Sequence, residues 1–313
     1  MKILVTGAAG FTGNLMMEYL TVQGAIEAIG LVRRQIFTEK WNADASIVAD
    51  LLDRESLRAE IVELCPDAVI HLAGLTRGTH EALYETNVTG TKNLLDAILA
   101  SNPACRILVI SSSAVYGYAG NIPIPEIAPL QPVNDYGKSK VAQEELTMSY
   151  NPDDAAIAIA RPFNLAGPGQ TDSFVCGRIV NQVISIERGE KDALDLWEMS
   201  SSRDLIDVKD VVRGYWALIT HPDFAGDCSG KIFNLGSGKA YRISEIISII
   251  EEITGEDYKI RLPDAVHKAA IPTQRSDNSR ITSLTGWKPV ISLKETLRDM
   301  LDYERKKRAQ EIR

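Results

Sequence analysis

The chain lacks the features that would place it in a membrane or on a nucleic acid. No apolar run approaches the roughly 20 residues needed to span a bilayer. The opening MKILVTGAAG reaches glycine too early to form the apolar core of a signal peptide. Among 313 residues, 34 Lys and Arg are outnumbered by 42 Asp and Glu, and a net charge of −8 argues against non-specific nucleic-acid binding. We expect a soluble cytoplasmic protein that binds neither nucleic acid nor membrane.

Cysteine and histidine are also scarce, with four residues of each type. The cysteines lie far apart and form no CxxC pair, which favours buried thiols in a reducing compartment over disulfides or a zinc site. The histidines share no ligand spacing, and His71, at the end of an apolar run, is expected to have a structural role. The sequence therefore predicts no metal site.

Short apolar segments rich in β-branched residues alternate with helical periodicity through the first half of the chain. Strands are predicted at residues 2–6, 26–32, 46–49, 68–72, 106–110 and 155–160. Helices are predicted at residues 14–22, 56–64, 86–100 and 138–150. Such alternation predicts a Rossmann-like α/β fold, in which a doubly wound parallel sheet carries helices on both faces.

The pattern loosens after Arg161, where proline and glycine become frequent. Further helices are predicted at residues 174–188, 208–219, 244–254 and 292–308. We expect a dinucleotide-binding domain over residues 1–162 and a smaller α/β lobe over residues 163–313, with crossings of the chain between them.

A glycine-rich loop, TGAAGFTG, joins the first predicted strand to the first predicted helix. Gly7, Gly10 and Gly13 would let the backbone turn sharply, approach a pyrophosphate and pack the helix against the strand. The N–H groups of the helix N-terminus would then face the anion, with Phe11 and Thr12 as further cofactor-binding residues. This strand, loop and helix context predicts a dinucleotide site.

The second predicted strand ends at Arg33 and Arg34, where an NAD site usually has Asp or Glu for the ribose 2′-hydroxyl. Guanidinium groups pair with a 2′-phosphate that a carboxylate would repel, so NADP(H) is favoured. NAD(H) stays an alternative, in which both arginines are simply solvated. Asp50 and Leu51 follow the third strand, where Asp50 would either meet the adenine or cap a helix.

Tyr136 and Lys140 are four residues apart in YGKSK and so share one face of a predicted helix. A nearby ammonium favours the phenolate and is expected to lower the pKa of Tyr136 from about 10 toward neutrality. The phenol would then donate or accept a proton near neutral pH. The pair predicts acid/base chemistry beside the dinucleotide.

Motifs along nearly the whole chain resemble those of the extended short-chain dehydrogenase/reductase family of nucleotide-sugar epimerases, dehydratases and reductases. They are TGAAGFTG, HLAG, TNVTGTKNLL, SSSAVYG, YGKSK, RPFNLAGPGQ and RDLIDVKDVV. The resemblance implies that Tyr136 is the acid/base, that Lys140 holds the nicotinamide ribose, and that Ser112 bonds to the reacting sugar oxygen. It also implies a nucleotide-sugar substrate in the second lobe. A homodimer through the helices predicted at residues 86–100 and 138–150 is implied too, although their apolar faces would equally suit burial against the sheet.

The same resemblance assigns further contacts by position in the motifs. Cofactor contacts fall on Leu72, Ala73, Gly74 and Asn87, and substrate contacts on Arg77, Ser113, Asn164, Arg203 and Arg275. Asn164 would contact the phosphates of the sugar nucleotide and Arg203 its pyrophosphate, with Arg275 or Arg280 as additional candidates. A turn cap for Asn164 and a surface ion pair for Arg203 stay open as alternatives.

The reaction follows from residues beside Ser112 and from the cofactor. Dehydratases of the family have Asp or Glu after this serine, where the chain has Ser113 and Ala114, so elimination of water is disfavoured. An epimerase keeps NAD bound, whereas a reductase exchanges its cofactor at each turnover, for which NADPH is suited. Arg33 and Arg34 favour NADPH and therefore a reductase. Residues 161–189 and 283–297 resemble reductases of GDP-4-keto-6-deoxy-D-mannose. We therefore expect NADPH-dependent reduction of the C4 ketone of that sugar nucleotide, in GDP-rhamnose-type synthesis.

One departure from the family keeps other substrates open. GDP-sugar relatives usually have Arg-Pro-x-Glu where this chain has His267, Lys268 and Ala270 in HKAAIPTQR. Two alternatives are a dTDP-4-keto-6-deoxysugar reductase and a UDP-hexose 4-epimerase with bound NAD. A third is a non-catalytic dinucleotide sensor.

Overall fold

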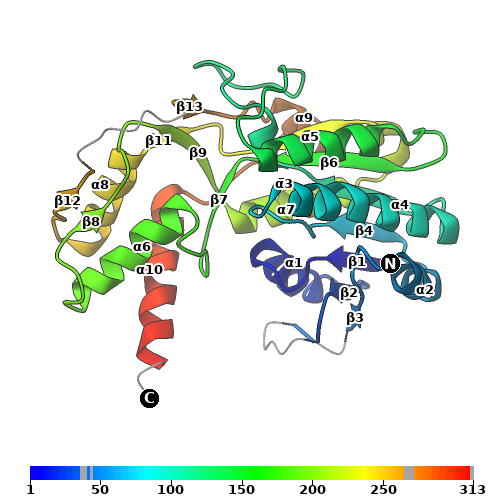
Figure 1. Ribbon diagram of the computed structural model, residues 1–313, viewed down its shortest axis with the longest axis horizontal. Helices are drawn as coiled ribbons and strands as arrows, with labels where there is room; N and C mark the ends of the chain where they lie inside the picture. The colour runs from blue at the N-terminus through cyan, green and yellow to red at the C-terminus, as the bar shows by residue number, and fades with distance from the viewer. Residues whose placement is uncertain (36–40, 43–44, 264–270, 311–313) are drawn as a thin grey trace.

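The computed structural model describes residues 1–35, 41–42, 45–263 and 271–310. Its larger layer is a parallel sheet of seven strands in the order β10-β6-β5-β4-β1-β2-β3 (Figure 1). The strands are β1 (Lys2–Thr6), β2 (Glu27–Val32), β3 (Ser46–Val48), β4 (Ala68–His71), β5 (Arg106–Ile110), β6 (Ile157–Pro162) and β10 (Ile232–Leu235). The order reverses between β1 and β4, where a ligand crevice is expected at the carboxyl ends of the strands. The doubly wound α/β prediction is confirmed.

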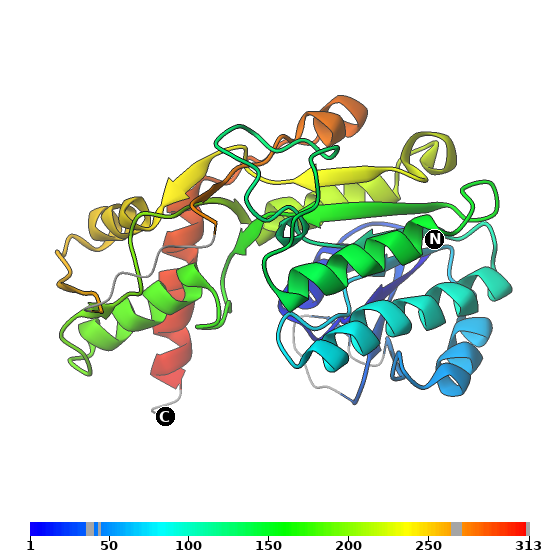
Figure 2. The same ribbon diagram turned by 45° about the horizontal axis from the view of Figure 1, so that its top comes forward.

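Helices cover both faces of this sheet because its strands are apolar on both sides. They are α1 (Phe11–Thr21) and α7 (Val208–Ile219) on one face, and α2 (Arg54–Leu64), α4 (Gly90–Ser101) and α5 (Asp135–Met148) on the other (Figure 2). Along β1, Ile3 and Val5 join a core with α1 and α7, while Leu4 between them joins a second core with α2 and α4. The apolar face of α4 packs against the sheet, since Leu94 and Ile98 are fully buried in that second core.

The second lobe is built on a smaller sheet, in which β9 (Ser202–Asp207) is the central strand. β9 pairs with β7 (Asn164–Ala166), β11 (Ala240–Arg242) and β13 (Thr273–Gln274). Its helices are α6 (Val175–Glu187), α8 (Ile243–Thr254) and α10 (Leu293–Gln310), which share a third apolar core. A short parallel pair, β8 (Leu194–Asp195) and β12 (Ile260–Arg261), lies at its outer end (Figure 1).

The two lobes are not consecutive along the chain. After β9 the chain returns through α7 and the π-helical turn η3 (Phe224–Cys228) to β10, which pairs with β6 in the large sheet. It then re-enters the small lobe at β11, and α9 (Ser279–Thr285) follows β13. A boundary at residue 162 therefore groups α7 and β10 with residues 163–313, although both belong to the layers of the large sheet.

Two local expectations are corrected. The single helix predicted at residues 86–100 is a π-helical turn η1 (Glu85–Thr89) followed by α4, and the short helix α3 (His80–Tyr84) precedes them. Cys65 is exposed, whereas the other three cysteines are buried, and all four are free thiols.

Within the described ranges, no helix is long and apolar enough to cross a membrane. The same residues contain no group of three or more His, Cys, Asp or Glu side chains that could hold a metal ion.

Candidate active site

The glycine loop after β1 is shaped by close backbone contacts. Gly7 has a φ of +68°, and a Cβ built on it would lie 2.9 Å from the backbone of Ala73. A Cβ on Gly13 would lie 2.1 Å from the carbonyl oxygen of Gly7. Gly10 precedes α1 as its N-cap and provides no side-chain hydrogen bond, so the first N–H groups of that helix are free to bind an anion. The loop thus has the tight turn and the open helix N-terminus that suit a phosphate.

The loop after β4 lies beside the glycine loop and beside α5. The backbone N–H of Ala73 donates to Thr6 Oγ1 at 3.0 Å, which joins the carboxyl ends of β4 and β1. A Cβ on Gly74 would lie 2.9 Å from Asn87 Oδ1 and 3.5 Å from Lys140 Nζ. The buried Asn87 side chain bonds to both backbone groups of Leu75. The structure therefore brings together residues that the sequence assigns to the cofactor from three separate motifs.

Asn87 reaches this position through the π-helical turn η1. The turn places its amide against Leu75 on one side, while its Nδ2 donates to Ser139 Oγ of α5 at 2.9 Å on the other. Asn87 is fully buried, so its contacts link the loop after β4 to α5. The π turn itself left no signal in the sequence.

Ser112 and Tyr136 meet at the end of β5. Ser112 begins a single turn of 3₁₀ helix, η2 (Ser113–Val115), and its Oγ accepts from the N–H of Ala114 at 3.1 Å. Tyr136 lies in the first turn of α5, which Asn134 caps through the N–H of Gly137. Burial raises the pKa of Tyr136, and a hydrogen bond from Ser112 partly offsets that rise.

The expected lowering of the Tyr136 pKa by Lys140 is therefore wrong for this structure. Lys140 Nζ donates to the carbonyl oxygen of Ile110 and to Gln143 Oε1, both at 2.8 Å. Burial lowers the pKa of Lys140 to about 8, while the carboxylate of Glu144 raises it. The ammonium lies on the same side of α5 as the phenol, but burial of the phenol dominates its pKa.

Substrate candidates converge from the small lobe on the same edge of the large sheet. Ser113 Oγ donates to Gln274 Oε1 at 3.2 Å, and Gln274 Nε2 donates back to the Ser113 carbonyl at 2.9 Å. Gln274 is paired with Arg203 in the register of β13 and β9, so Arg203 also lies at this junction. Asn164 on β7 donates to the carbonyl of Asp204 at 3.3 Å. Sequence reasoning missed Gln274, whose only signal was its place beside Arg275.

Three of the cationic candidates make hydrogen bonds within the protein. Arg280 bonds to the Ile232 carbonyl at 2.8 Å and pairs with Glu126, and its contact with phosphates stays a prediction. Arg77 donates to the Ser173 carbonyl at 2.7 Å and so bridges the loop after β4 to the segment before α6. Burial lowers the pKa of Arg203, with Glu198 opposing it, and its Nη1 bonds to the Ser202 carbonyl.

The residues expected around the adenine and the ribose take different positions. Arg33 and Arg34 follow β2 directly and are exposed. Leu51 is buried in the core beneath α4. Asp50 accepts from the N–H of Leu52 at 2.9 Å, and the cap of α2 is Asp53, so the helix-cap alternative for Asp50 is wrong.

The remaining segment named from the sequence is described only in part. His267, Lys268 and Ala270 lie outside the described residues. Arg275 is half-buried, and its carbonyl oxygen accepts from the N–H of Ile124 at 2.8 Å.

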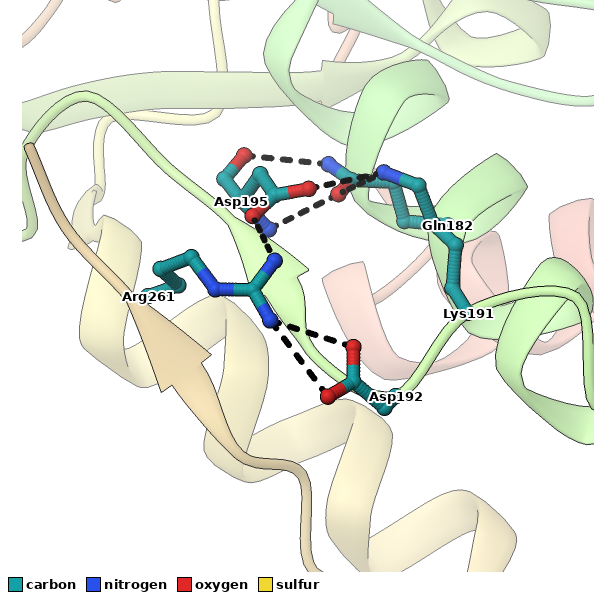
Figure 3. Close-up of polar contacts among 5 residues, drawn as sticks. All are labelled: Gln182, Lys191, Asp192, Asp195 and Arg261. Atoms are coloured by element: carbon teal, nitrogen blue, oxygen red, sulfur yellow. Dashed lines mark hydrogen bonds and ion pairs between the residues drawn. The ribbon is translucent and has the colours of Figure 1, made fainter.

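A cavity of about 480 Å³ lies at the outer end of the small lobe, between α6, β8 and β12. Arg261 closes one side of it by pairing with Asp192 and Asp195, each at 3.1 Å (Figure 3). Gln182 of α6 fixes β8 there by bonding to both backbone groups of Asp195. The indole of Trp197, which also lines the cavity, belongs to a residue that is 64% exposed.

Comparison with known proteins shows the family to which this arrangement belongs. Residues 3–236 match the NAD dependent epimerase/dehydratase family. The chain belongs to this family. As a member, it is an NAD(P)-dependent oxidoreductase, and the resemblance seen in the sequence motifs is confirmed.

Relatives with named activities match nearly the whole length of the chain. It is 34% identical to a GDP-6-deoxy-D-mannose reductase of Pseudomonas aeruginosa, an alignment that covers 97% of each chain. It is 27% identical to a UDP-glucose 4-epimerase of Bacillus subtilis, covering 96% of this chain and 95% of the other. The solved structure of RMD from Pseudomonas aeruginosa, complexed with NADPH, matches with a TM-score of 0.83 at 31% identity, covering 97% of this chain and 99% of that one.

Proposed function

We propose that the chain uses NADPH to reduce the C4 ketone of a nucleotide-linked 4-keto-6-deoxyhexose, and that this substrate is GDP-4-keto-6-deoxy-D-mannose. The observation that carries the proposal is the 34% identity to a GDP-6-deoxy-D-mannose reductase over 97% of both chains. The identity to a UDP-glucose 4-epimerase over a similar length is 27%. The meeting of Ser112, Tyr136 and Lys140 at one sheet edge supports ketone chemistry there.

The residues present fit a nicotinamide dinucleotide. Gly7 and Gly13 form a cradle whose close approach a Cβ would prevent, and α1 points its free N–H groups into it. Gly10, Phe11 and Thr12 would lie along the pyrophosphate, and Gly74, Asn87 and Lys140 near the nicotinamide ribose. When bound, the cofactor supplies the hydride for the ketone carbon.

The protein's own residues would supply the proton and stabilise the charge that its transfer leaves behind. Because its pKa is raised, Tyr136 keeps its proton at neutral pH, which suits a donor to the developing alkoxide. The Ser112 hydroxyl, which bonds to Tyr136 in the structure, would turn its single proton to the same alkoxide oxygen when the substrate is bound and hold that oxygen in place. Lys140 is charged below a pH of about 8 and would stabilise the phenolate that Tyr136 becomes.

The cofactor preference has its own support. Arg33 and Arg34 are exposed at the end of β2, and the related structure from Pseudomonas aeruginosa is a complex with NADPH. A guanidinium group there would pair with the 2′-phosphate of NADPH. NADH remains the alternative cofactor, which lacks that phosphate.

We assign the nucleoside part of the substrate to the cavity beside Trp197. An exposed indole offers a face for stacking on a base, a contact worth about 1–3 kcal/mol in other proteins. Arg178 in the same cavity supplies a positive charge. Trp197→Ala should therefore raise the KM for the sugar nucleotide about tenfold or more while the Kd for NADPH is unchanged. An unchanged KM would remove Trp197 from the binding site.

The substrate is tested by following the absorbance of NADPH, with NADH in parallel. GDP-4-keto-6-deoxy-D-mannose and dTDP-4-keto-6-deoxyglucose are the two ketosugars to compare. Faster oxidation of NADPH with the GDP-sugar supports the proposal, and preference for the dTDP-sugar overturns its choice of base. Interconversion of UDP-glucose and UDP-galactose without added cofactor would replace the reductase by an epimerase.

The homodimer stays a prediction. The apolar residues of α4 named above are used inside the chain, so a dimer through α4 and α5 would need other side chains of these helices. Sedimentation velocity at micromolar concentration distinguishes a monomer from a dimer.

A further inference from the structure

A buried chain of hydrogen bonds leads from the glycine loop to the ammonium of Lys140. Thr6, the last residue of β1, bonds to His71 Nδ1 at 2.7 Å, and His71 Nε2 bonds to Thr91 Oγ1 at 2.9 Å. Gln143 Nε2 donates to Thr91 Oγ1 at 2.7 Å, and its Oε1 accepts from Lys140 Nζ at 2.8 Å. Thr6, His71, Thr91 and Gln143 are fully buried.

The chemistry of the groups fixes the direction of every bond in this chain. Lys140 can only donate, so the carbonyl of the Gln143 side chain faces it and the amide NH₂ faces Thr91. The Thr91 hydroxyl donates to the carbonyl of Asn87 at 2.7 Å, so its oxygen is left to accept from both Gln143 and His71.

The two bonds at the His71 ring complete this series of hydrogen bonds. The Thr91 hydroxyl has no proton left for His71, so His71 carries a proton on Nε2 and donates it to Thr91. In the neutral ring, Nδ1 then accepts the proton of Thr6 Oγ1, whose oxygen also accepts the N–H of Ala73. In agreement, burial and the charge of Lys140 lower the pKa of His71 to about 3.

Within the part of the chain that the structure describes, the bonds at Lys140 leave one N–H of the ammonium for the site. The Ile110 carbonyl of β5 and Gln143 of α5 take the other two, and Gly74 lies against Nζ. The ionisable groups around Lys140 are His71 on β4 and Tyr136 and Glu144 on α5. Glu144 is bound to Arg161, and His71 stays neutral, so Gln143 is the uncharged acceptor that defines where the ammonium points.

We propose that Gln143 is a positioning residue that holds the Lys140 ammonium toward Gly74, and that Thr91 and His71 lock the Gln143 amide in the orientation this requires. The inference rests on the proposed role of Lys140 at the cofactor ribose. Without the Gln143 oxygen, the ammonium loses a charge-assisted hydrogen bond inside the protein, where such a bond is strong.

A pair of identical substitutions separates this role from simple packing. Thr91 and Thr147 are both buried in helices, and each hydroxyl donates at 2.7 Å to the carbonyl four residues earlier. The two threonines differ in that the Thr91 hydroxyl also accepts hydrogen bonds from Gln143 and His71. We expect Thr91→Val to weaken NADPH binding about tenfold, Thr91→Ser to restore it, and Thr147→Val to leave it unchanged. Equal Kd values for the two valine variants would overturn the proposal.

A second measurement does not depend on activity. The ¹³Cε signal of Lys140, assigned with Lys140→Met, reports the pKa of its amine directly. Gln143→Met removes the acceptor and should lower that pKa by about one pH unit, whereas Gln143→Glu should raise it by a similar amount. Thr147→Val should leave the midpoint at the wild-type value.

The outcomes distinguish the two proposals. Opposite shifts in the two Gln143 variants support the positioning role even if no sugar nucleotide is reduced, in which case only the proposed function fails. Coincident midpoints in wild type and both variants refute the positioning role, whichever substrate the enzyme reduces.

Discussion

Removing one charge from the buried ion pair between Glu144 and Arg161 should destabilise the protein strongly. Arg161 of β6 donates from Nε and Nη2 to the two carboxylate oxygens of Glu144, at 2.8 and 2.5 Å. Ser111 bonds to the same carboxylate. The two charged residues are only 2% and 3% exposed, so the pair joins α5 to the sheet without help from water.

The magnitude follows from what Glu144→Gln leaves behind. The guanidinium would stay buried with its charge unbalanced, which typically costs about 3–5 kcal/mol. Its Nη1 would keep the Tyr116 hydroxyl at 2.7 Å and the Glu126 carbonyl at 3.0 Å, and the new amide oxygen would keep one bond. Because these acceptors remain, we expect the free energy of unfolding to fall by about 3 kcal/mol, the lower end of that range.

Glu187→Gln provides a matched control. Arg305 also donates from Nε and Nη2 to the two carboxylate oxygens of Glu187, at 3.0 and 2.5 Å. The side chains of Arg305 and Glu187 are, however, 40% and 29% exposed. Water can replace the lost contact, so the expected cost is below about 1 kcal/mol. Urea unfolding followed by circular dichroism gives both values. Losses that agree within about 1 kcal/mol would refute the argument that burial sets the cost of the unbalanced charge.

Three other predictions concern the proton donor, the cofactor and the dependence of stability on pH. Tyr136→Phe should lower kcat at least about 100-fold because it removes the proton donor, while fluorescence titration finds NADPH bound as in wild type; near-normal turnover would remove Tyr136 from the mechanism. Replacing Arg33 and Arg34 together by Ser should lower the preference for NADPH over NADH about 10- to 100-fold in kcat/KM, and an unchanged ratio would show that neither arginine reads the 2′-phosphate. The pKa of His71 is lowered from 6.5 to about 3, so the unfolded chain binds more protons between these values and stability falls as the pH drops through this window. Between pH 7 and 5, wild type should therefore lose about 2 kcal/mol more than His71→Gln in urea unfolding, and equal losses would contradict the buried neutral ring.

The fold was predictable because its signals are local. The first six strands of the large sheet along the chain, β1 to β6, are short, largely apolar and followed by a polar or glycine-containing turn, and a parallel sheet buried on both faces requires such runs. The return of α7 and β10 to this sheet has no comparable signal. No strand was predicted at residues 232–235, a short segment that contains the polar Asn234, and its pairing with β6 depends on tertiary packing.

The candidate site was predictable where residues share a motif, and not where distant segments meet. Spacing alone places Tyr136 and Lys140 on one side of α5. It could not show that burial dominates the pKa of the phenol, because burial depends on the surrounding lobes. Gln274 lies 161 residues from Ser113 and reaches it only because β13 pairs with β9.

Two neighbouring residues of α5 should give the helix two separable functions. Gln143 follows Lys140 by three positions and bonds to Thr91 of α4 and to the Lys140 ammonium, which we propose it positions. Glu144 follows by four positions and faces β5 and β6, where its ion pair fixes the helix to the sheet. The consequences of losing each should therefore be opposite in kind. Glu144→Gln should cost mainly stability, with Lys140 still held by Gln143 and Ile110. Gln143→Met should cost mainly cofactor binding, because a methionine fills the same volume and leaves the ion pair intact.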